Sequence, residues 1–335
     1  MSSLHLRLNP IRRAIVVLLG ASLVACGGGG GGGDEPPPTL INLTTANMTT
    51  VAHAAAAAPF ALGAAGSVAT IADGGGTVTR LVGSIVPALA RGMDGADGQA
   101  RALAFYPGDP AACPHGGTVT VSVDDADDDG VFDVGDTMSF VFDQCRLSPA
   151  EVTHGRTDVT MTHVGGGPLP SFGARMTMHE MSALGVDGRH AVTTDGVAFL
   201  DYARLDAVRE RMRLTVENEL TARIRTHQGV DDTLGLQHGY TYESTFDGAS
   251  GVSTTSFGGL FRSVAAGGLA RARTDAAFQD HVSDAYPSTG ALNVGGARGT
   301  LIVRAMSTEQ VRLELDHDDC GTAEQVQTQS WDWLM

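Results

Sequence analysis

The chain has 335 residues, of which 42% are hydrophobic and 18% charged, and its formal net charge is −16. This length holds one large domain or two modest ones, and the apolar content is sufficient for a packed core. The acidic balance excludes nucleic acid as a partner, because an acidic surface repels a phosphate backbone.

The first 25 residues have the pattern of a secretory signal peptide. Arg7, Arg12 and Arg13 give a positive start, and an apolar run follows from Ala14 to Ala25. That run is too short to cross a bilayer as a helix, so the pattern indicates a cleaved signal and not a transmembrane anchor. Loss of residues 1–25 leaves 19 basic against 38 acidic side chains, a net charge of −19.

The signal ends in Leu23-Val24-Ala25-Cys26, which resembles the lipobox of bacterial lipoproteins. In that family the thiol of the cysteine receives a diacylglyceryl group and the signal is cut before it. The resemblance therefore implies a lipid anchor at Cys26, and two or more acyl chains anchor stably. Gly27 in the next position implies the outer membrane. The alternative is an ordinary signal peptide with an incidental cysteine.

Residues 26–40 are expected to form a tether between the anchor and the folded body. Gly27 to Gly33 is an unbroken glycine run and gives flexibility, while Pro36 to Pro38 stiffens its end. Residues 41–112 then differ in composition and include the alanine run Ala54–Ala58. We expect two or more short helices there, one of them within residues 78–93. Alanine-rich helices with few charges pack against something larger.

Residues 113–335 predict an antiparallel β domain, because apolar and polar residues alternate. The clearest case is Arg211 to Arg225, which predicts one strand with an apolar and a charged face. The chain ends in WDWLM, and we expect a final strand with Trp331 and Trp333 on one face. The fold class is thus mainly β: a large antiparallel β-meander sheet that can curve into a half-barrel, with a small helical N-terminal part as cover.

The segment between the first two predicted strands of this domain is crowded with aspartates. Its spacing resembles the calcium loops of EF-hand and dockerin proteins, with carboxylates at positions 1, 3, 5, 9 and 12 and glycine at position 6. Its flanks alternate like strands, so the expected device is a calcium-type loop on a hairpin without a sensor's helix pair. The alternative is a solvated acidic turn with no metal. The predicted ligands are Asp125, Asp127, Asp129, the Val131 carbonyl, Asp133 and Asp136.

Three cysteines remain for disulfide chemistry, which export permits. Cys113 and Cys145 flank the acidic hairpin just beyond the predicted strand ends, so we favour a bond between them. The alternative pairs one of the two with Cys320. A degenerate copy of the loop surrounds Cys320, with the candidate metal ligands Asp316, Asp318 and Glu324.

No catalytic motif occurs, and the histidines are scattered singly, so no catalytic residue is predicted. The body resembles uncharacterised proteobacterial envelope lipoproteins with a cysteine-flanked, Gly-Asp-rich hairpin. These observations favour a non-enzymatic structural or interaction module of the envelope, bound to the membrane by its anchor and to an envelope protein, a glycan or a lipid. The alternative is a periplasmic carrier of lipid or another apolar ligand in a half-barrel, with methionines such as Met161 and Met176 lining the cavity. A hydrolase without a recognisable motif is the third reading.

Overall fold

The computed structural model describes residues 39–66, 110–129, 133–149, 151–165, 169–186, 191–225, 229 and 231–335. All of them belong to one compact unit, Pro38–Met335. The signal peptide, Cys26, most of the tether and the predicted helix within residues 78–93 lie outside the described residues.

The described chain is mainly β, as the sequence predicts, and its sixteen strands form a single antiparallel sheet. Helix α1 spans Met48–Gly66 and contains the alanine run, and a short helix α3 spans Trp331–Leu334. The strands, in chain order, are β1 Ala111–Ala112, β2 Thr118–Asp124, β3 Thr137–Ser148, β4 Glu151–Val164, β5 Ser171–Gly185, β6 Ala191–Arg204, β7 Arg209–Val216, β8 Leu220–Arg225, β9 Asp231–Leu236, β10 Thr241–Asp247, β11 Val252–Ser263, β12 Gly268–His281, β13 Thr289–Gly295, β14 Thr300–Ala305, β15 Gln310–Asp316 and β16 Gln325–Ser330.

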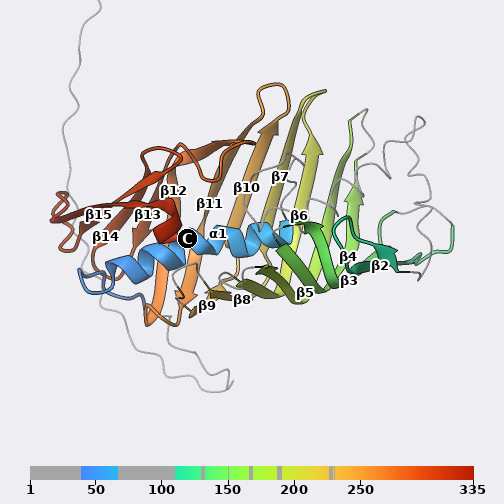
Figure 1. The fold of residues 1–335 in the computed structure, drawn as a ribbon, viewed down its shortest axis with the longest axis horizontal. Coiled ribbons are helices and arrows are strands. Elements are labelled where there is room, and N and C mark those ends of the chain that lie inside the picture. The colour runs from blue at the N-terminus through green and yellow to red at the C-terminus, as the bar shows by residue number, and fades with distance from the viewer. Residues whose placement is uncertain are drawn as a thin grey trace, which may run out of the picture. The chain divides into compact units, whose positions relative to one another are not determined.

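The sheet is a meander in which nearly every strand pairs with its neighbours in the sequence (Figure 1). The middle is interrupted: β7 and β8 both pair with β6, and β9 and β10 both pair with β11. Arg211 to Arg225 is therefore not the one strand that alternation predicts. Its apolar residues do share the buried face, but the chain is broken at Glu217–Glu219. On both sides of the break the buried residues have even numbers, so the alternation of apolar and polar residues does not reveal it.

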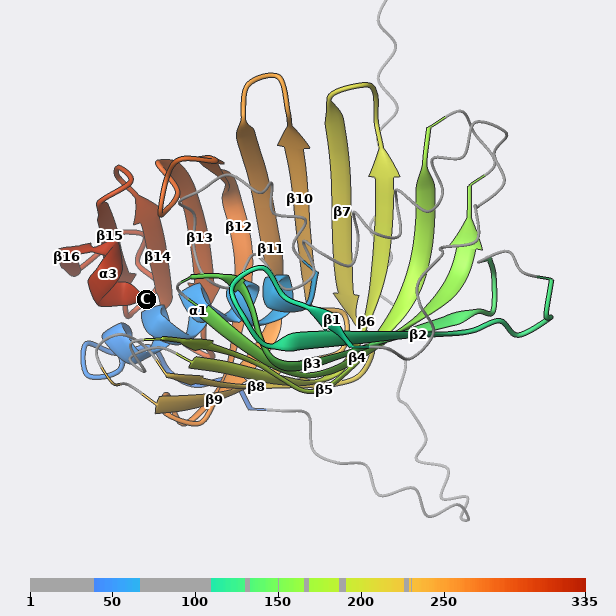
Figure 2. The ribbon, with the colours of Figure 1, turned by 45° about the vertical axis from the view of Figure 1, so that its right-hand side comes forward.

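A line of irregularities crosses the sheet and bends it. Gly196 in β6 and Gly259 in β11 have φ of 139° and 144°, values that favour glycine. A Cβ on Gly259 would lie 2.6 Å from the Cα of Tyr240. Bulges bend strands and increase their twist, and Figure 2 shows the strands curving along their length. Register shifts mark the same line in the pairs β3/β4, β4/β5, β5/β6, β11/β12 and β12/β13.

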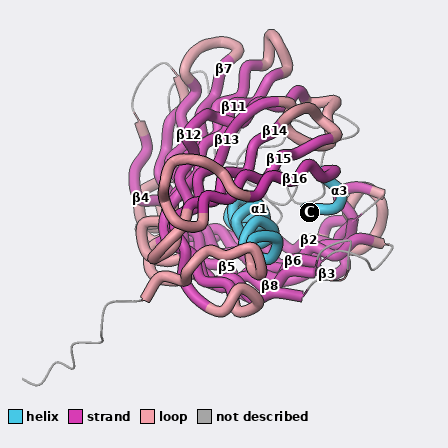
Figure 3. The backbone as a smooth tube through the Cα atoms, turned by 90° about the vertical axis from the view of Figure 1, so that its left-hand side faces the viewer, coloured by secondary structure: helices cyan, strands magenta, loops and turns pink. Residues whose placement is uncertain are grey.

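The bent sheet wraps around α1 (Figure 3). The helix contacts β6, β7, β8, β9, β11 and β14, strands that are far apart in the sequence. Residues 51–59, Ala61 and Leu62 are all buried. Small alanine side chains allow the strands to approach the helix from several directions, and a helix that is apolar all round belongs in a core. The predicted cover of the sheet is confirmed for α1.

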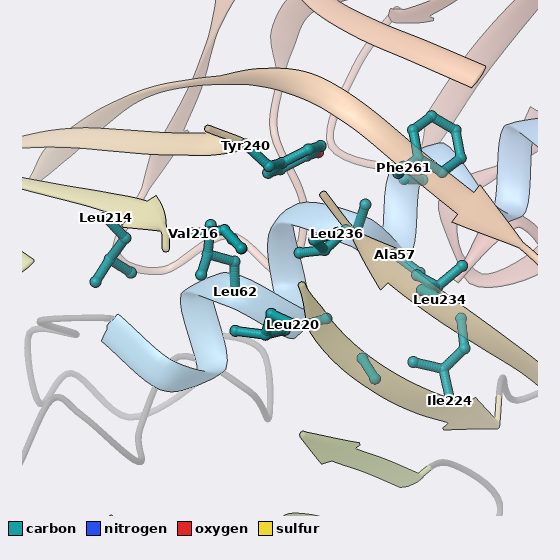
Figure 4. Packing of buried hydrophobic residues seen from close by; sticks show 14 of the residues in the cluster. Ala57, Leu62, Leu214, Val216, Leu220, Ile224, Leu234, Leu236, Tyr240 and Phe261 are labelled. Carbon is teal, nitrogen blue, oxygen red and sulfur yellow. The ribbon is translucent and has the colours of Figure 1, made fainter. Parts of the chain in front are cut away.

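Larger side chains fill the space where the helix meets the broken strands. Figure 4 shows Leu62 beside Val216 and Leu220, and Ala57 beside Leu234. All five are buried to at least nine-tenths. Burial of a leucine side chain contributes about 1.5–3 kcal/mol, so this contact fixes α1 against both halves of the interrupted sheet.

The chain does not end in a strand with both tryptophans on one face, as the alternation predicts. It ends in α3, where the Ser330 hydroxyl accepts a hydrogen bond from the Trp333 N–H at 3.2 Å. A serine cap satisfies a free N–H at a helix start, and this favours the turn over continued strand. Trp331 is buried, and Trp333 lies 4.9 Å from the ring of His53 in α1.

Candidate metal centre and the disulfide-linked hairpin

The acidic loop joins two strands, as expected, and not two helices. β2 and β3 pair without a shift from Thr118 opposite Asp143 to Asp124 opposite Thr137. The far side of the loop is held by β4: the Gly135 N–H donates to the Met161 carbonyl at 3.0 Å, and the Met161 N–H donates to the Asp136 carbonyl at 2.9 Å. The loop is thus positioned by three strands.

The structure gathers every carboxylate that the spacing predicts as a ligand. One oxygen each of Asp125, Asp127 and Asp136 lie within 4.8 Å of one another, and so do oxygens of Asp127, Asp129 and Asp133. The two groups share Asp127. Carboxylates so placed are the hard oxygen ligands that calcium takes from flexible loops. The Val131 carbonyl lies outside the described residues.

Asp136 at the twelfth position is the anchor of the loop. It is only 1% exposed. One carboxylate oxygen accepts the Ala126 N–H at 2.8 Å and the other accepts the Asp133 N–H at 2.7 Å. Hydrogen bonds to an ionised carboxylate are strong, so Asp136 draws both arms of the loop together. An asparagine here would keep one of these bonds and lose the other, because its amide NH2 group cannot accept a hydrogen bond.

Mutual repulsion marks the middle of the loop. The pKa of Asp127 is raised by loss of hydration and then by the charge of Asp129. The pKa of Asp133 is raised by the same loss and by the charges of Asp129 and Asp136. Like charges this close disfavour the ionised form. A bound divalent cation would reverse the sign of the interaction, so the donor set fits calcium.

The predicted disulfide is confirmed: Cys113 and Cys145 are bonded, with Cα atoms 5.5 Å apart and a sequence separation of 32. Their expected position is only half right. Cys113 precedes β2, but Cys145 lies inside β3, which continues to Ser148. A register shift beside Cys145 turns this part of β3, so the bond ties the bent end of β3 to the edge of the sheet. Cys320 is a free, exposed thiol.

The second loop also brings its predicted residues together. One ligand atom each of Asp316, Asp318, Cys320 and Glu324 lie within 4.8 Å of one another. Here backbone N–H groups donate hydrogen bonds to the carboxylates. Asp316 accepts the N–H groups of Cys320 at 3.1 Å and Gly321 at 2.7 Å.

Glu324 closes this second loop from its other end. It accepts the His317 N–H at 2.9 Å, and that bond, as the largest cause, lowers the pKa of Glu324 to about 2. Its other oxygen lies 3.7 Å from the Cys320 sulfur. A hydrogen bond with Asp318 raises the pKa of the Cys320 thiol, which disfavours the thiolate that would be a good metal ligand.

Sequence reasoning missed the fourth position of both loops. Asp128 and Asp319 have left-handed backbones with φ of 58° and 60°, a conformation that aspartate tolerates. Asp319 also accepts the Gly299 N–H at 3.0 Å and so ties the second loop to the β13–β14 turn. The sequence does contain a pattern that could have revealed them, because each of the two aspartates stands three positions after the first predicted ligand of its loop.

The histidines do not assemble into a site in the described parts of the chain. His154 and His179 pair separately with Asp143 at 3.8 Å and Asp158 at 3.2 Å. Among the described residues, the groups of three or more possible metal ligands belong to the two acidic loops, and none contains a histidine. No helix in the described ranges is long and apolar enough to cross a membrane.

Comparison with known proteins identifies no relative of this chain. No family model matches it, and neither a curated protein nor a solved structure does.

Proposed function

We propose that this chain is a lipid-anchored protein of the bacterial outer membrane that works as a non-enzymatic structural or interaction module. Cys26 carries the anchor, the Cys113–Cys145 bond reinforces the first hairpin, and calcium in the Asp125–Asp136 loop stabilises it. The partner is an envelope protein or a glycan that binds the outer face of the sheet or its loops.

The observation that carries the proposal is the filled concave face. A carrier needs a cavity, but α1 occupies the space that the bent sheet encloses (Figure 3). The methionines that could line such a cavity are packed into the core. Met161, Met176, Met178, Met181 and Met212 are each at most 3% exposed.

The convex face offers a polar surface for a partner. Across β6, β7 and β10, Asp201 lies opposite Arg213 and Arg213 lies opposite Glu243. Opposite charges on neighbouring strands stabilise a sheet by about 0.2–1 kcal/mol for each pair. The same alternation supplies both signs of charge to a protein partner and hydrogen-bonding groups to a glycan.

The start of the described chain suits the end of a tether. Leu40 and Asn42 form parallel bridges with Leu269 and Arg298. The Ile41 N–H donates to the Leu269 carbonyl and the Leu43 N–H to the Arg298 carbonyl, both at 2.8 Å. Force on the tether therefore reaches the sheet directly, before the chain enters α1.

The anchor is tested by expressing the full-length chain and its Cys26→Ser variant in a Gram-negative host with labelled palmitate. We expect label and outer-membrane fractionation for the wild type and neither for the variant. A wild-type chain that stays unlabelled contradicts the anchor, whichever fraction it reaches.

The module is tested on the wild-type chain extracted from its native envelope. We expect a protein or glycan to co-purify with the wild type. The amount that co-purifies should fall when Arg213→Glu reverses a charge on the convex face. Arg225→Glu, at the far end of the same face, is the matched control. Solvent extraction and mass spectrometry then measure non-covalent lipid. An equimolar lipid that survives purification contradicts the module and supports the carrier.

A further inference from the structure

The last strand of the sheet has an unprotected edge. Within the described residues, β16 pairs only with β15, in an unshifted register from Gln310 opposite Ser330 to Leu315 opposite Gln325. Its sequence, QVQTQS, has no charged residue and no proline. Natural sheets blunt their edges with such residues, because a free edge pairs with other strands. This strand has none of those protections.

The phase of the ladder shows which backbone groups are free. The Trp331 N–H donates to the Glu309 carbonyl at 3.1 Å. Antiparallel partners exchange hydrogen bonds at every second residue, so Gln325, Gln327 and Gln329 direct their backbone groups to β15. Val326 and Thr328 direct theirs to the free edge, and both side chains are exposed.

The three glutamines of β16 share the face turned toward the core. They lie opposite the buried residues Leu315, Leu313 and Val311 and are themselves half-buried. The side-chain carbonyl oxygen of Gln325 is buried and accepts no hydrogen bond. A buried acceptor without a donor costs free energy, so this end of the strand is not stabilised by its own side chains alone.

We propose that β16 pairs with β16 of a second copy of this chain, antiparallel, around a twofold axis through Gln327. This register places Gln325 opposite Gln329 of the second copy and Gln327 opposite its own equivalent. It also places Val326 opposite Thr328 of the second copy, and these are the residues with free backbone groups. The pairing adds about four backbone hydrogen bonds.

The geometry favours this register, and the composition of the strand favours a second copy as its partner. A twofold axis perpendicular to the sheet keeps each face on its own side, so the core-facing glutamines must meet one another. An axis through Thr328 would instead place Gln325 opposite Trp331, which is buried in its own chain. A glutamine ladder stabilises paired strands, and an uncharged strand pairs with its own copy without like-charge repulsion.

The expected assembly is a weak, symmetric dimer. Six-residue edges bury less than the roughly 1,600 Å² of a standard stable interface. We therefore expect a monomer–dimer equilibrium that depends on concentration. The inference does not rest on the lipid anchor or on calcium, and it would survive the failure of either.

The register is tested by cysteine cross-linking of the full-length chain in detergent, in a Cys320→Ser background. Facing residues of a non-hydrogen-bonded pair have Cα atoms about 4.5 Å apart, which a disulfide spans. We expect Gln327→Cys to give a covalent dimer on mild oxidation. Thr328→Cys is the matched control, since it does not face itself and should cross-link at least tenfold more slowly. Equal rates, or cross-linking into ladders longer than a dimer, overturn the proposal.

The edge itself is tested by Thr328→Pro against Thr328→Val, with mass measured by sedimentation. Proline removes an N–H that points away from β15, so the melting temperature of the proline variant should match that of the valine variant. We expect the valine variant to dimerise and the proline variant to remain monomeric. Dimers in both, or a wild type that stays monomeric up to millimolar concentration, refute the inference.

Discussion

The two ends of the sheet are held by different means. At the first end, a disulfide between Cys113 and Cys145 closes one end of the β2–β3 hairpin. The loop at its other end holds carboxylates that repel one another. At the last end, the chain folds back as α3, and aromatic packing closes the structure. Trp331 stacks on Tyr286 at 5.9 Å, and His53 of α1 hydrogen-bonds the Leu334 carbonyl.

The difference shows what each end needs from its surroundings. The first end buries Met138, Phe140 and Phe142 in the core, and the disulfide adds a covalent link beside the acidic loop. In the acidic loop of the last end, the carboxylates of Asp316 and Glu324 accept backbone N–H donors. The two acidic loops therefore share a spacing of acidic residues but differ in how their carboxylates are held. Substitutions at the two ends of the sheet should have different effects on stability.

Trp331→Ala should be the most damaging change. Trp331 is 4% exposed, and its indole N–H donates to the Ser307 carbonyl at 3.0 Å. Truncation of a buried tryptophan costs about 3–5 kcal/mol of unfolding free energy, measured by chemical denaturation. Trp331→Phe keeps the ring packing and should recover most of it. A loss below 1 kcal/mol for the alanine variant would mean that packing does not close the last end.

Removal of the disulfide should weaken the first end. In the chain-entropy model a loop of this length contributes about 3–4 kcal/mol. We expect Cys113→Ala/Cys145→Ala to lose that amount in a denaturant titration under oxidising conditions. Cys320→Ser removes an exposed thiol that is not part of a disulfide and should change the unfolding free energy by less than about 0.5 kcal/mol. Equal effects of the two changes would contradict a staple at the first end.

Calcium should stabilise the first loop and not the second. At tenfold excess over its dissociation constant, a ligand adds about 1.4 kcal/mol to the unfolding free energy. We expect millimolar calcium to raise the melting temperature relative to EDTA, and Asp129→Asn to abolish the shift. Asp318→Asn is the control in the second loop and should leave it intact. An unchanged melting temperature in the wild type would falsify the metal site.

Acid should loosen the last end through His53. Burial lowers the pKa of His53 below its ordinary 6.5, while the hydrogen bond to the Leu334 carbonyl opposes this. Below pH 6.5 the unfolded chain binds a proton at His53 more readily than the folded chain does. The contribution of His53 to the unfolding free energy is therefore complete above pH 6.5 and declines as the pH falls below it. We expect His53→Gln to flatten this decline in denaturation curves between pH 7.5 and 5.5. Parallel curves for variant and wild type would show that His53 is not the sensor.

Asp127→Asn should have the smallest effect and the most informative sign. It removes a carboxylate whose pKa is raised by burial and by Asp129. In EDTA we expect a slightly higher melting temperature than for the wild type, because repulsion is relieved. In millimolar calcium the order should reverse, because a ligand is lost. The same order in both conditions is incompatible with a cation held by this loop.

Much of the fold could be predicted from local pattern. The alternation around Met212 and Leu214 places them on the buried face, and the alanine run at Ala54–Ala58 becomes the buried helix. The five aspartates gather as their spacing indicates. Each of these depends on periodicity or on a short loop, where neighbours in sequence are neighbours in space.

The features that the sequence did not predict depend on contacts that local patterns do not report. Glu217–Glu219 breaks a strand without changing its parity, and Trp331 lies in a turn whose residues alternate like a strand. The contact of His53 with Leu334 joins positions 281 residues apart. No local pattern reports such contacts, since they form only after the sheet has bent.

By itself the sequence determined the antiparallel sheet, the alanine-rich helix and the clustered aspartates, because side-chain period and loop spacing are set by covalent geometry. It favoured the Cys113–Cys145 bond but left Cys320 as an alternative partner. Only the tertiary structure decided that the sheet wraps around α1, that backbone donors bind the carboxylates of the second acidic loop while those of the first repel one another, and that β16 pairs on one edge alone among the described strands. Those outcomes depend on bulges aligned across many strands and on backbone donors brought together from distant parts of the chain.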